Sequence, residues 1–362
     1  MKAYAYATGD RYAEYYTAEE YELLTSDTAG ESEGIGINVI YTTVTVGGVE
    51  YDAIKVINVT PESPAEKAGV RIGDYIFYVG IDEETRESVY SLGYTMALSK
   101  LVGKAGTYAE FTALRFDTDG NFEEMPFSIL RAPIETSSVM SRICETDDSV
   151  AVIKITEFDL TTPRQLSEKM DAYIDAGIEK FVFDVRYNPG GSLASIVAVL
   201  SYFLDEGQTI ISEVDKAGNK ETIVCAPINS YSDEFASCNV SKKDIGKYSG
   251  YSYAVLCNED TASAAELFTA NFRDYSLGKT VGKTTFGKGS MQSTISFEYF
   301  GYDGALKLTT RMYFPPCGES YDGIGIEPDI SVELSAEAAA TNVYELKDAD
   351  DAQLQAAIKT LN

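Results

Sequence analysis

The second half of the chain alternates strand-like and helix-like segments, and this alternation restricts the possible fold more than any other feature. Short apolar runs at residues 150–155, 180–185 and 253–257 have the length and composition of buried strands. Helix-like segments occupy residues 162–176 and 192–204. Strands that alternate with helices of about 10–15 residues predict an α/β core with parallel strands.

The strand at residues 253–257 leads into a polar turn and then into a helix-like segment that contains Ser263. At a strand-to-helix turn a hydroxyl is exposed, and the helix N-terminus stabilises negative charge. Ser263 is therefore a candidate nucleophile. A serine at such a position is also a common helix N-cap, and the residues alone leave that alternative open.

The chain of 362 residues contains no histidine, which excludes a Ser-His-Asp triad and a zinc site with histidine ligands. A base for Ser263 must then be a lysine, an aspartate, a glutamate or a tyrosine. Lysine suits this role because burial lowers its pKa until it is neutral near neutral pH. Lys288, in Phe286-Gly287-Lys288-Gly289, is the candidate base, although it could also be an ordinary solvated lysine.

Composition excludes several other classes of protein. A hydrophobic content of 44% indicates a folded chain, and its length allows about two or three domains. The 57 acidic and 29 basic residues give a net charge of -28, which argues against a nucleic-acid partner. No run of 18 apolar residues predicts a membrane span. The five cysteines show no C-x-x-C spacing, so no metal cluster is expected; Cys225 and Cys238 could pair or remain free thiols.

Glycines flank a strand start in Gly34-Ile35-Gly36-Ile37, where backbone amides can face a ligand with no side chain in the way. The motifs Ser63-Pro64-Ala65, Ala68-Gly69 and Gly73-Asp74 follow. Together these residues resemble a PDZ domain of the bacterial type. The resemblance implies that a peptide adds to the domain as a strand and that its C-terminal carboxylate binds at residues 34–37. The alternative is an ordinary small β-rich domain.

The first residues of the chain are rich in tyrosine, alanine and glutamate. Tyr12, Tyr15 and Tyr16 suggest one short helical piece, and the residues after Thr17 suggest a second. Thr17 followed by Glu20 fits a capping box. So short a segment cannot hold its own core, and we expect it to dock on another part of the chain.

Asn188-Pro189-Gly190-Gly191 follows the strand at residues 180–185, and its consecutive glycines free backbone amides that could stabilise an oxyanion. Taken alone, this motif could be only a turn. Its combination with the other motifs resembles the C-terminal processing, or tail-specific, serine peptidase family. The stretches that carry this resemblance, besides the PDZ-like region, are Ile155-Thr156-Glu157-Phe158, residues 183–191 (FDVRYNPGG), residues 261–266 (TASAAE), residues 284–292 (TTFGKGSMQ) and residues 323–329 (GIGIEPD).

The family resemblance implies a role for each matching residue. Lys288 follows Ser263 by 25 positions, as in the family pattern, so Ser263 matches the nucleophile and Lys288 the general base. Gln292 matches a residue that orients the lysine. Ala265 departs from the pattern, which usually has a second serine there, but that serine is not the nucleophile. Glu266, Asp274 and Thr285 match supporting positions, for which a purely structural role is an equal alternative.

The resemblance also places an oxyanion hole at two backbone amides. Ala264 supplies one of them, directly after the nucleophile. The other belongs to Gly191, with Gly190 as the alternative. No cofactor and no metal is implied.

These arguments predict an α/β fold, with a crotonase-like peptidase core of mixed sheet and helices, an inserted mostly-β PDZ domain and a short helical N-terminal segment. The expected divisions are an N-terminal segment (1–33), a PDZ domain (34–131), a peptidase core (132–335) and a helical tail (336–362).

The implied function is a serine endopeptidase that captures protein or peptide C-termini through the PDZ domain and cleaves upstream of them. The alternatives are a catalytically silent peptide-binding scaffold and a crotonase-like acyl-CoA enzyme. The resemblance implies an exported enzyme of the cell envelope or the extracellular space, with a signal or anchor absent from this sequence. The oligomeric state does not follow from the sequence.

Overall fold

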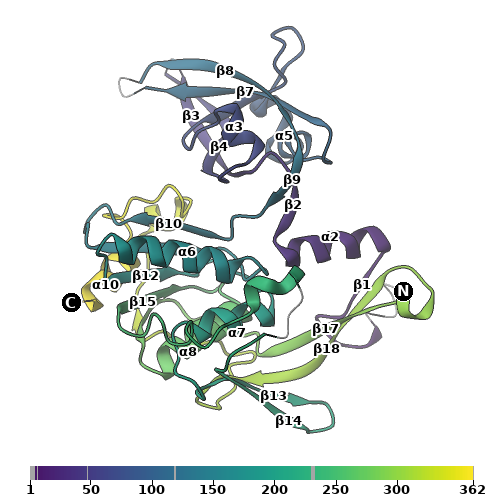
Figure 1. The fold of residues 1–362 in the computed structure, drawn as a ribbon. Helices are drawn as coiled ribbons and strands as arrows, with labels where there is room; N and C mark the ends of the chain where they lie inside the picture. The colour runs from purple at the N-terminus through teal and green to yellow at the C-terminus, as the bar shows by residue number, and fades with distance from the viewer. Residues whose placement is uncertain (1–4, 6, 47, 118–119, 230–232, 362) are drawn as a thin grey trace. The chain divides into compact units, whose positions relative to one another are not determined.

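The computed structural model describes residue 5 and residues 7–46, 48–117, 120–229 and 233–361 (Figure 1). The chain divides into two compact units. The core unit comprises Met1–Gly30 and Ser138–Asn362, and the inserted unit comprises Glu31–Ser137. Each unit has its own hydrophobic core. The inserted unit begins and ends within a few residues of the PDZ domain expected at 34–131.

A six-stranded sheet forms the centre of the core unit (Figure 1), with the order β10-β11-β12-β15-β16-β19. All neighbouring pairs from β11 to β19 are parallel, and only β10 is antiparallel to its neighbour. The predicted parallel α/β arrangement is therefore confirmed. The strands are β10 (Val139–Ile143), β11 (Val150–Ile155), β12 (Lys180–Asp184), β15 (Ser252–Cys257), β16 (Gly278–Gly282) and β19 (Ile330–Ser331).

Side chains alternate across this sheet, as the period of a strand requires. Phe181 and Phe183 of β12 belong to the larger apolar cluster, which includes residues of α6, α7 and α8. Val182, between them, belongs to a second cluster with residues of α10. The sheet is thus buried on both faces, as parallel sheets are. The helices are α6 (Thr162–Asp175), α7 (Leu193–Ser201), α8 (Ala264–Asp274), α9 (Ala336–Ala340) and α10 (Ala352–Thr360).

A second, antiparallel sheet completes the core unit and is organised around β18 (Ala305–Phe314). β17 (Ser290–Ser296) pairs with β18, as do β1 (Glu14–Tyr16) and β13 (Thr209–Asp215). β14 (Lys220–Val224) extends the sheet beyond β13. No local sequence pattern predicts this sheet, because it joins strands that lie far apart in the chain.

The N-terminal segment differs in part from the prediction. The helical piece expected around Tyr12, Tyr15 and Tyr16 is wrong: residues 14–16 form β1 and pair with β18, which is the docking that such a short segment needs. The second piece is a helix, α2 (Ala18–Ala29), and its capping box is confirmed. The Thr17 amide donates to Glu20 Oε2 (2.8 Å), and the Glu20 amide donates to Thr17 Oγ1 (3.3 Å).

The C-terminal helix α10 packs on the parallel sheet through Leu354 and Ala357, which are both buried. A buried ion cluster fixes its start. Arg186 donates to Asp184 (2.9 Å) and to Asp351 (2.8 Å), the N-cap residue of α10. The end of the chain is therefore fixed to the strand that precedes the Asn-Pro-Gly-Gly turn.

The inserted unit contains an antiparallel sheet with the order β3-β4-β5-β7-β8, so β3 is an edge strand. Helices α3 and α5 and the two-stranded sheet β2-β9 accompany it. The main strands are β3 (Ile37–Val46), β4 (Val49–Val59), β5 (Tyr75–Val79), β7 (Tyr108–Phe116) and β8 (Phe122–Leu130). The smaller elements are β2 (Glu31–Gly34), α3 (Pro64–Ala68), β6 (Glu87–Ser88), α4 (Val89–Leu92), α5 (Tyr94–Leu101) and β9 (Ala132–Glu135).

Candidate active site

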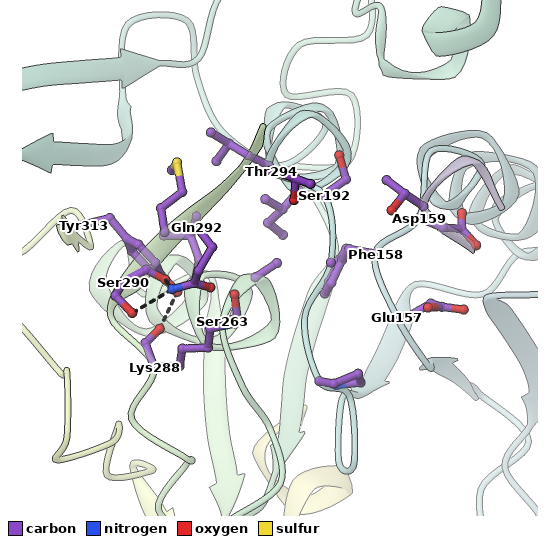
Figure 2. A pocket seen from close by; sticks show the side chains of 18 of the residues that line it. Glu157, Phe158, Asp159, Ser192, Ser263, Lys288, Ser290, Gln292, Thr294 and Tyr313 are labelled. Atoms are coloured by element: carbon purple, nitrogen blue, oxygen red, sulfur yellow. Dashed lines mark hydrogen bonds between the residues drawn. The ribbon is translucent and has the colours of Figure 1, made fainter. Parts of the chain in front are cut away.

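A cavity of about 560 Å³ in the core unit brings the predicted residues together. Ser263, Lys288 and Gln292 all line it, and Figure 2 shows their side chains on the same side of the cavity. Gly191 and Ala264 line it as well. Residues of the antiparallel sheet, of α2, α7 and α8, and of the turn at residues 157–159 contribute to the remaining wall.

Ser263 is the N-cap residue of α8 and has a strained backbone, with φ 56° and ψ -118°. An ordinary N-cap residue has extended φ and ψ angles, so capping alone does not account for this conformation. Non-glycine residues in such regions cost about 1–3 kcal/mol and are concentrated at functional sites. A serine on a sharp, strained turn between a strand and a helix is the arrangement that exposes a nucleophilic hydroxyl.

The turn after β12 lies directly beside the Ser263 turn, because β12 and β15 are parallel neighbours whose C-terminal ends share one edge. Buried Asn188 joins the two turns. Its carbonyl accepts from the Ala262 amide (2.9 Å), and its side chain donates to the Ile155 carbonyl (2.9 Å). Asn188 Oδ1 accepts from the Gly190 amide (2.8 Å).

Gly190 and Gly191 approach their neighbours too closely for any side chain. A Cβ on Gly190 would lie 2.6 Å from Ser263 Cβ, and one on Gly191 would lie 2.3 Å from the Phe158 carbonyl oxygen. The Gly190 amide is already bonded to Asn188. By contrast, the Gly191 and Ala264 amides donate no hydrogen bond to any residue that the structure describes.

Glu266 connects the serine turn to the lysine loop, residues 283–289. Its carboxylate is fully buried and accepts from the Ser263 amide (2.9 Å). It also accepts from the Lys288 amide (2.8 Å), the Gly287 amide (2.7 Å) and the Thr285 hydroxyl (2.6 Å). Burial raises the pKa of Glu266, and these hydrogen bonds oppose that shift. Glu266 and Thr285 therefore set the separation between the serine turn and the lysine loop.

The second Gly-Ile-Gly-Ile motif, at residues 323–326, packs behind the lysine loop. The Gly323 amide donates to the Gly287 carbonyl (2.8 Å), and the Ile326 amide donates to Thr285 Oγ1 (2.7 Å). A Cβ on Gly287 would lie 2.8 Å from the Gly325 amide nitrogen, so only glycine fits there.

The Lys288 side chain is partly buried, and burial is the main cause that lowers its pKa. The nearby positive charge of Lys307 lowers it further, whereas the Glu266 carboxylate opposes the shift. Lys288 Nζ lies 4.9 Å from the centroid of the Tyr12 ring. Within the described part of the chain, no hydrogen bond joins Lys288 Nζ to Ser263 Oγ.

Gln292 lies at a β-bulge between β17 and β18. Its Nε2 donates to Ser290 Oγ (3.1 Å) and to Thr309 Oγ1 (3.2 Å), as the dashed lines in Figure 2 partly indicate. These bonds fix the plane of the amide. A direct contact between Gln292 and Lys288 is not found among the described residues, so the orienting role expected for Gln292 stays a prediction.

Asp274 does not lie at the cavity. It ends α8, and with a rise of about 1.5 Å per residue its position is about 16 Å from Ser263 along the helix. Its carboxylate instead binds Arg273 (2.9 Å) and accepts from the Cys317 amide (3.0 Å). The structure therefore gives Asp274 a role in holding the loop around residue 317.

Sequence reasoning missed Tyr313 and Lys307, which both come from β18 and line the cavity. The Tyr313 hydroxyl donates to the Lys288 carbonyl. Lys307 donates to Glu14 Oε2 (2.9 Å) and to the Tyr16 hydroxyl (2.6 Å). No local motif marks either residue, because only the pairing of β18 with β17 and β1 brings them to the cavity.

In the inserted unit, the predicted carboxylate loop has a distinct local structure. The Ile35 carbonyl accepts from the Ala65 amide (2.8 Å), and the Gly36 carbonyl accepts from the Thr60 amide (2.9 Å). Gly36 has φ 84°, and a Cβ there would lie 2.3 Å from Ser63 Cβ. The Ile35 and Gly36 amides themselves find no acceptor among the described residues. Ile37 then begins β3.

Disulfides, metal sites and helices long and apolar enough to span a membrane are absent from the described residues. All five cysteines are free thiols. In the described ranges, no group of three acidic or cysteine side chains is placed to hold a metal ion. None of the helices described for this chain combines the length and apolar character required to cross a bilayer.

Comparison with known proteins identifies the family. Residues 149–332 match the profile described as peptidase family S41. A "Carboxy-terminal-processing protease" of Bartonella bacilliformis is 30% identical over 325 residues, which cover 90% of this chain and 67% of that protein. A "Probable CtpA-like serine protease" of Staphylococcus epidermidis is 30% identical over 324 residues, which cover 89% of this chain and 58% of that protein. The chain thus spans less than two thirds of the staphylococcal relative.

Solved structures agree with this assignment at the level of fold. An S41 protease from Bacteroides fragilis superposes with a TM-score of 0.59 at 16% identity, covering 99% of this chain and 89% of that one. The photosystem II D1 C-terminal processing protease gives a TM-score of 0.50 at 21% identity, covering 92% and 80%. The mixed α/β architecture with several sheets is that of known S41 proteases, and the chain belongs to peptidase family S41.

Proposed function

We propose that this chain is a serine endopeptidase in which Ser263 is the nucleophile and Lys288 the general base. One observation carries the proposal. A serine on a strained turn at a helix N-terminus shares a cavity with a partly buried lysine whose pKa is lowered. The chain has no histidine that could serve as the base instead. Family membership supports the same assignment.

In the first step, neutral Lys288 Nζ accepts the Ser263 proton while Oγ attacks the carbonyl carbon of the scissile bond. The resulting tetrahedral intermediate collapses as the C–N bond breaks, and the Lys288 ammonium returns its proton to the leaving amine. Lys288 then deprotonates a water molecule, which attacks the acyl-enzyme ester. The bond between the carbonyl carbon and Oγ then breaks as the Lys288 ammonium returns its proton to Oγ, which releases the new C-terminus and regenerates Ser263 and neutral Lys288. Hydrogen bonds in a resting site are often longer than in the reacting complex, so the absence of a Ser263–Lys288 bond is compatible with this scheme.

The Gly191 and Ala264 amides form the oxyanion hole in this proposal. Both lack an acceptor among the described residues, whereas the Gly190 amide already donates to Asn188. This difference favours Gly191 over Gly190. The Ala264 amide also lies at the first turn of α8, where the helix dipole favours negative charge. For Gln292, we propose that its fixed amide leaves Oε1 to accept from the Lys288 ammonium once substrate is bound.

The inserted unit acts as a PDZ domain in this proposal and binds the C-terminus of the substrate. β3 pairs only with β4 among the described strands, so its other edge is open to an added strand. The loop before β3 offers the Ile35 and Gly36 amides to a carboxylate. Substrates would then be proteins or peptides with accessible C-termini. We further propose an exported enzyme, as the family resemblance implies; fractionation of the native cells tests that location.

Peptide cleavage by the wild type, Ser263→Ala and Lys288→Ala tests the dyad. We expect turnover in the wild type only, with a rate that rises with pH because Lys288 must be neutral to act. The lowered pKa places this rise below the ordinary pKa of lysine. Cleavage that survives Ser263→Ala would refute the nucleophile. Tight peptide binding without turnover in the wild type would instead support a silent scaffold.

Binding to the full-length Ser263→Ala variant tests the PDZ proposal without cleavage of the ligand. One peptide is compared with its C-terminally amidated form, which lacks the charge. We expect the free carboxylate to bind more tightly by at least about tenfold, the equivalent of one charge-assisted hydrogen bond of about 1.5–3 kcal/mol. Equal affinities would show that residues 34–37 do not recognise a C-terminus.

A further inference from the structure

The N-terminal segment places an aromatic ring against the proposed base. Lys288 Nζ lies 4.9 Å from the centroid of the Tyr12 ring. Tyr12 is not one of the residues that line the cavity, whereas Lys288 is. The lysine therefore faces the substrate cavity on one side and Tyr12 on another. Tyr12 is 276 positions before Lys288 in the chain, so neither local sequence nor the neighbouring motifs predict this contact.

Contacts on both sides of Tyr12 fix it in this place. Asp10 accepts from the Thr309 amide (2.6 Å) and the Thr309 hydroxyl (2.9 Å), on the same strand that carries Lys307. Two residues after Tyr12, β1 begins and pairs with β18. The segment is thus held along β18 before and after Tyr12.

Arg11, between Asp10 and Tyr12, is connected to the lysine loop through Asp322. Arg11 Nη2 lies 3.8 Å from Asp322 Oδ1, and that same oxygen accepts from the Gly289 amide (2.9 Å). Arg11 also lies over the Tyr12 ring, 4.6 Å from its centroid. Asp10 therefore contacts β18, Arg11 contacts Asp322 behind the lysine loop, and Tyr12 contacts Lys288 in that loop.

We propose that Tyr12 is a positioning residue of the peptidase: its ring excludes water from the side of Lys288 that faces away from the cavity, and so keeps the amine neutral and directed toward Ser263. The inference rests on the proposed role of Lys288 as general base. It assigns to residues 10–12 a part in catalysis beyond their role in docking the N-terminus.

The ring has two opposing effects on the pKa of Lys288. A ring face attracts an ammonium group, which favours the charged lysine; at a partly exposed site this is worth less than about one pKa unit. Exclusion of water disfavours the charged lysine, by up to about 3–5 pKa units at full burial. The net pKa of Lys288 is lowered, with burial as its largest cause. In this proposal the ring contributes to that burial, and its exclusion of water outweighs its attraction for the ammonium.

Charged groups around Lys288 also shift its pKa. The positive charges of Lys307, on β18, and of Arg11, in the N-terminal segment, disfavour the ammonium. Glu266, on α8, favours it, but this carboxylate is already saturated by four donors. The Tyr313 hydroxyl is engaged by the Lys288 carbonyl. The ring of Tyr12 differs from all of these because it acts without a charge, so its effect should not depend on salt.

The ring of Tyr12, and not its hydroxyl, carries this role. The hydroxyl is buried and has no hydrogen-bond partner in the part of the chain that the structure describes. Replacing an unpaired buried hydroxyl by hydrogen is neutral or stabilising. Tyr12→Phe is therefore a matched control that keeps the ring. Tyr15→Ala is a second control, because Tyr15 belongs to the same segment but stacks on Phe297 and not on Lys288.

The experiment compares the full-length wild type with Tyr12→Ala, Tyr12→Phe and Tyr15→Ala. The pH dependence of Ser263 modification by a fluorophosphonate reports the activated serine without any peptide, and kcat and KM are measured on one peptide in parallel. We expect Tyr12→Ala to move the acid limb of both profiles upward by about one pH unit, which is about tenfold in rate below the limb. KM should stay unchanged. In Tyr12→Phe and Tyr15→Ala, the acid limb should lie at the same pH as in the wild type.

Several outcomes would overturn the inference. An acid limb that stays in place in Tyr12→Ala, or one that moves to lower pH with faster reaction, would show that the ring does not protect the neutral amine. The same shift in Tyr15→Ala would assign the effect to docking of the segment in general. If Tyr12→Ala does not fold, Tyr12→Asn, which admits water with a larger side chain, must show the same upward shift. A wild type that is neither labelled nor active would refute the proposed function itself, which is a separate result.

Discussion

The serine side and the lysine side of the cavity differ in how the chain builds them. Ser263 follows β15 of the parallel sheet, and its turn is bonded to the turn after the neighbouring strand β12. Lys288 lies in a loop ahead of an antiparallel hairpin, and its neighbours come from residues 10–12 and 321–326. The serine side takes its geometry from one sheet, whereas the lysine side depends on segments that are distant in sequence.

Burial differs in the same way. All but the first residue of β15 are buried, but only the first residue of β17 is. A change near Ser263 should therefore alter both stability and activity. A change near Lys288 should alter the pH dependence of activity with a smaller cost in stability.

The largest expected effect is on stability alone, at the ion cluster beneath the serine side. Burial by itself would raise the pKa of Asp184, but Arg186 and Lys154 hold it well below its ordinary value. Arg186→Met removes the guanidinium that joins Asp184 to Asp351 and leaves Lys154, 3.4 Å from Asp184, as the remaining cation there; it should cost about 3–5 kcal/mol in urea unfolding. Without Arg186 the pKa of Asp184 should rise, so the loss should be greatest at neutral pH and shrink in acid.

The matched control is Lys242→Met. Lys242 forms an exposed ion pair with Glu206 (3.5 Å), which should be worth less than about 1 kcal/mol. The pH–rate profile of folded Arg186→Met should match the wild type. If that profile shifts instead, the two sides of the cavity are not independent.

Gly190→Ala should lower both the stability and the activity of the protein. The new Cβ would lie 2.6 Å from Ser263 Cβ and 2.9 Å from the Ala262 carbonyl oxygen, at a φ of 108°. We expect kcat/KM to fall by about 10²–10³, as when one oxyanion donor is lost. Gly177→Ala is the control: it has a φ of 87° and open space around it, so it adds backbone strain without a clash. Equal losses in the two variants would contradict the steric argument.

Glu266→Gln tests the connection between the two sides. An amide nitrogen would replace one of the oxygens that accept from Ser263, Thr285, Gly287 and Lys288, and would face donors. We expect a loss of about 1–3 kcal/mol in stability and a roughly tenfold or greater fall in kcat/KM. Thr285→Val removes a single donor and should cost less. Wild-type behaviour of Glu266→Gln would mean that Glu266 already works in its protonated form.

The smallest expected effect is at Lys307. Its positive charge helps to lower the pKa of Lys288, so Lys307→Gln should raise that pKa and move the acid limb of activity to higher pH, by less than about one unit. Added salt should shift the wild type in the same direction and the variant much less, because salt screens the Lys307 charge. A limb that moves to lower pH would contradict the assigned sign.

Much of the serine side could be predicted from local sequence. Strand, turn and helix follow one another within residues 253–274, and parallel neighbours must bring their C-terminal turns together. The capping box at Thr17 and Glu20 was likewise readable, because all of its atoms lie within one turn of helix.

The lysine side could not be predicted in the same way. Tyr12, Tyr15 and Tyr16 carry no strand signal strong enough to exclude a helix, and pairing with β18 decides the conformation of Tyr15 and Tyr16. Tyr313 and Lys307 reach the cavity through strand pairing across long separations, which no motif encodes. Asp274 shows the converse: a residue that matches a family position lies at the far end of α8.

The contact between Tyr12 and Lys288 has a consequence for the time at which the peptidase becomes competent. A ribosome adds about 5–20 residues per second, so the 276 positions from Tyr12 to Lys288 take roughly 14–55 seconds to synthesise. During that interval Tyr12 cannot contact Lys288, because Lys288 has not been synthesised. The segment at residues 321–326, which supports the lysine loop, is synthesised later still. The lysine loop has all of these contacts only when the residues up to 326 have been synthesised. In the proposed mechanism, Ser263 therefore gains its base only after the ribosome has passed the lysine loop and the segment that supports it.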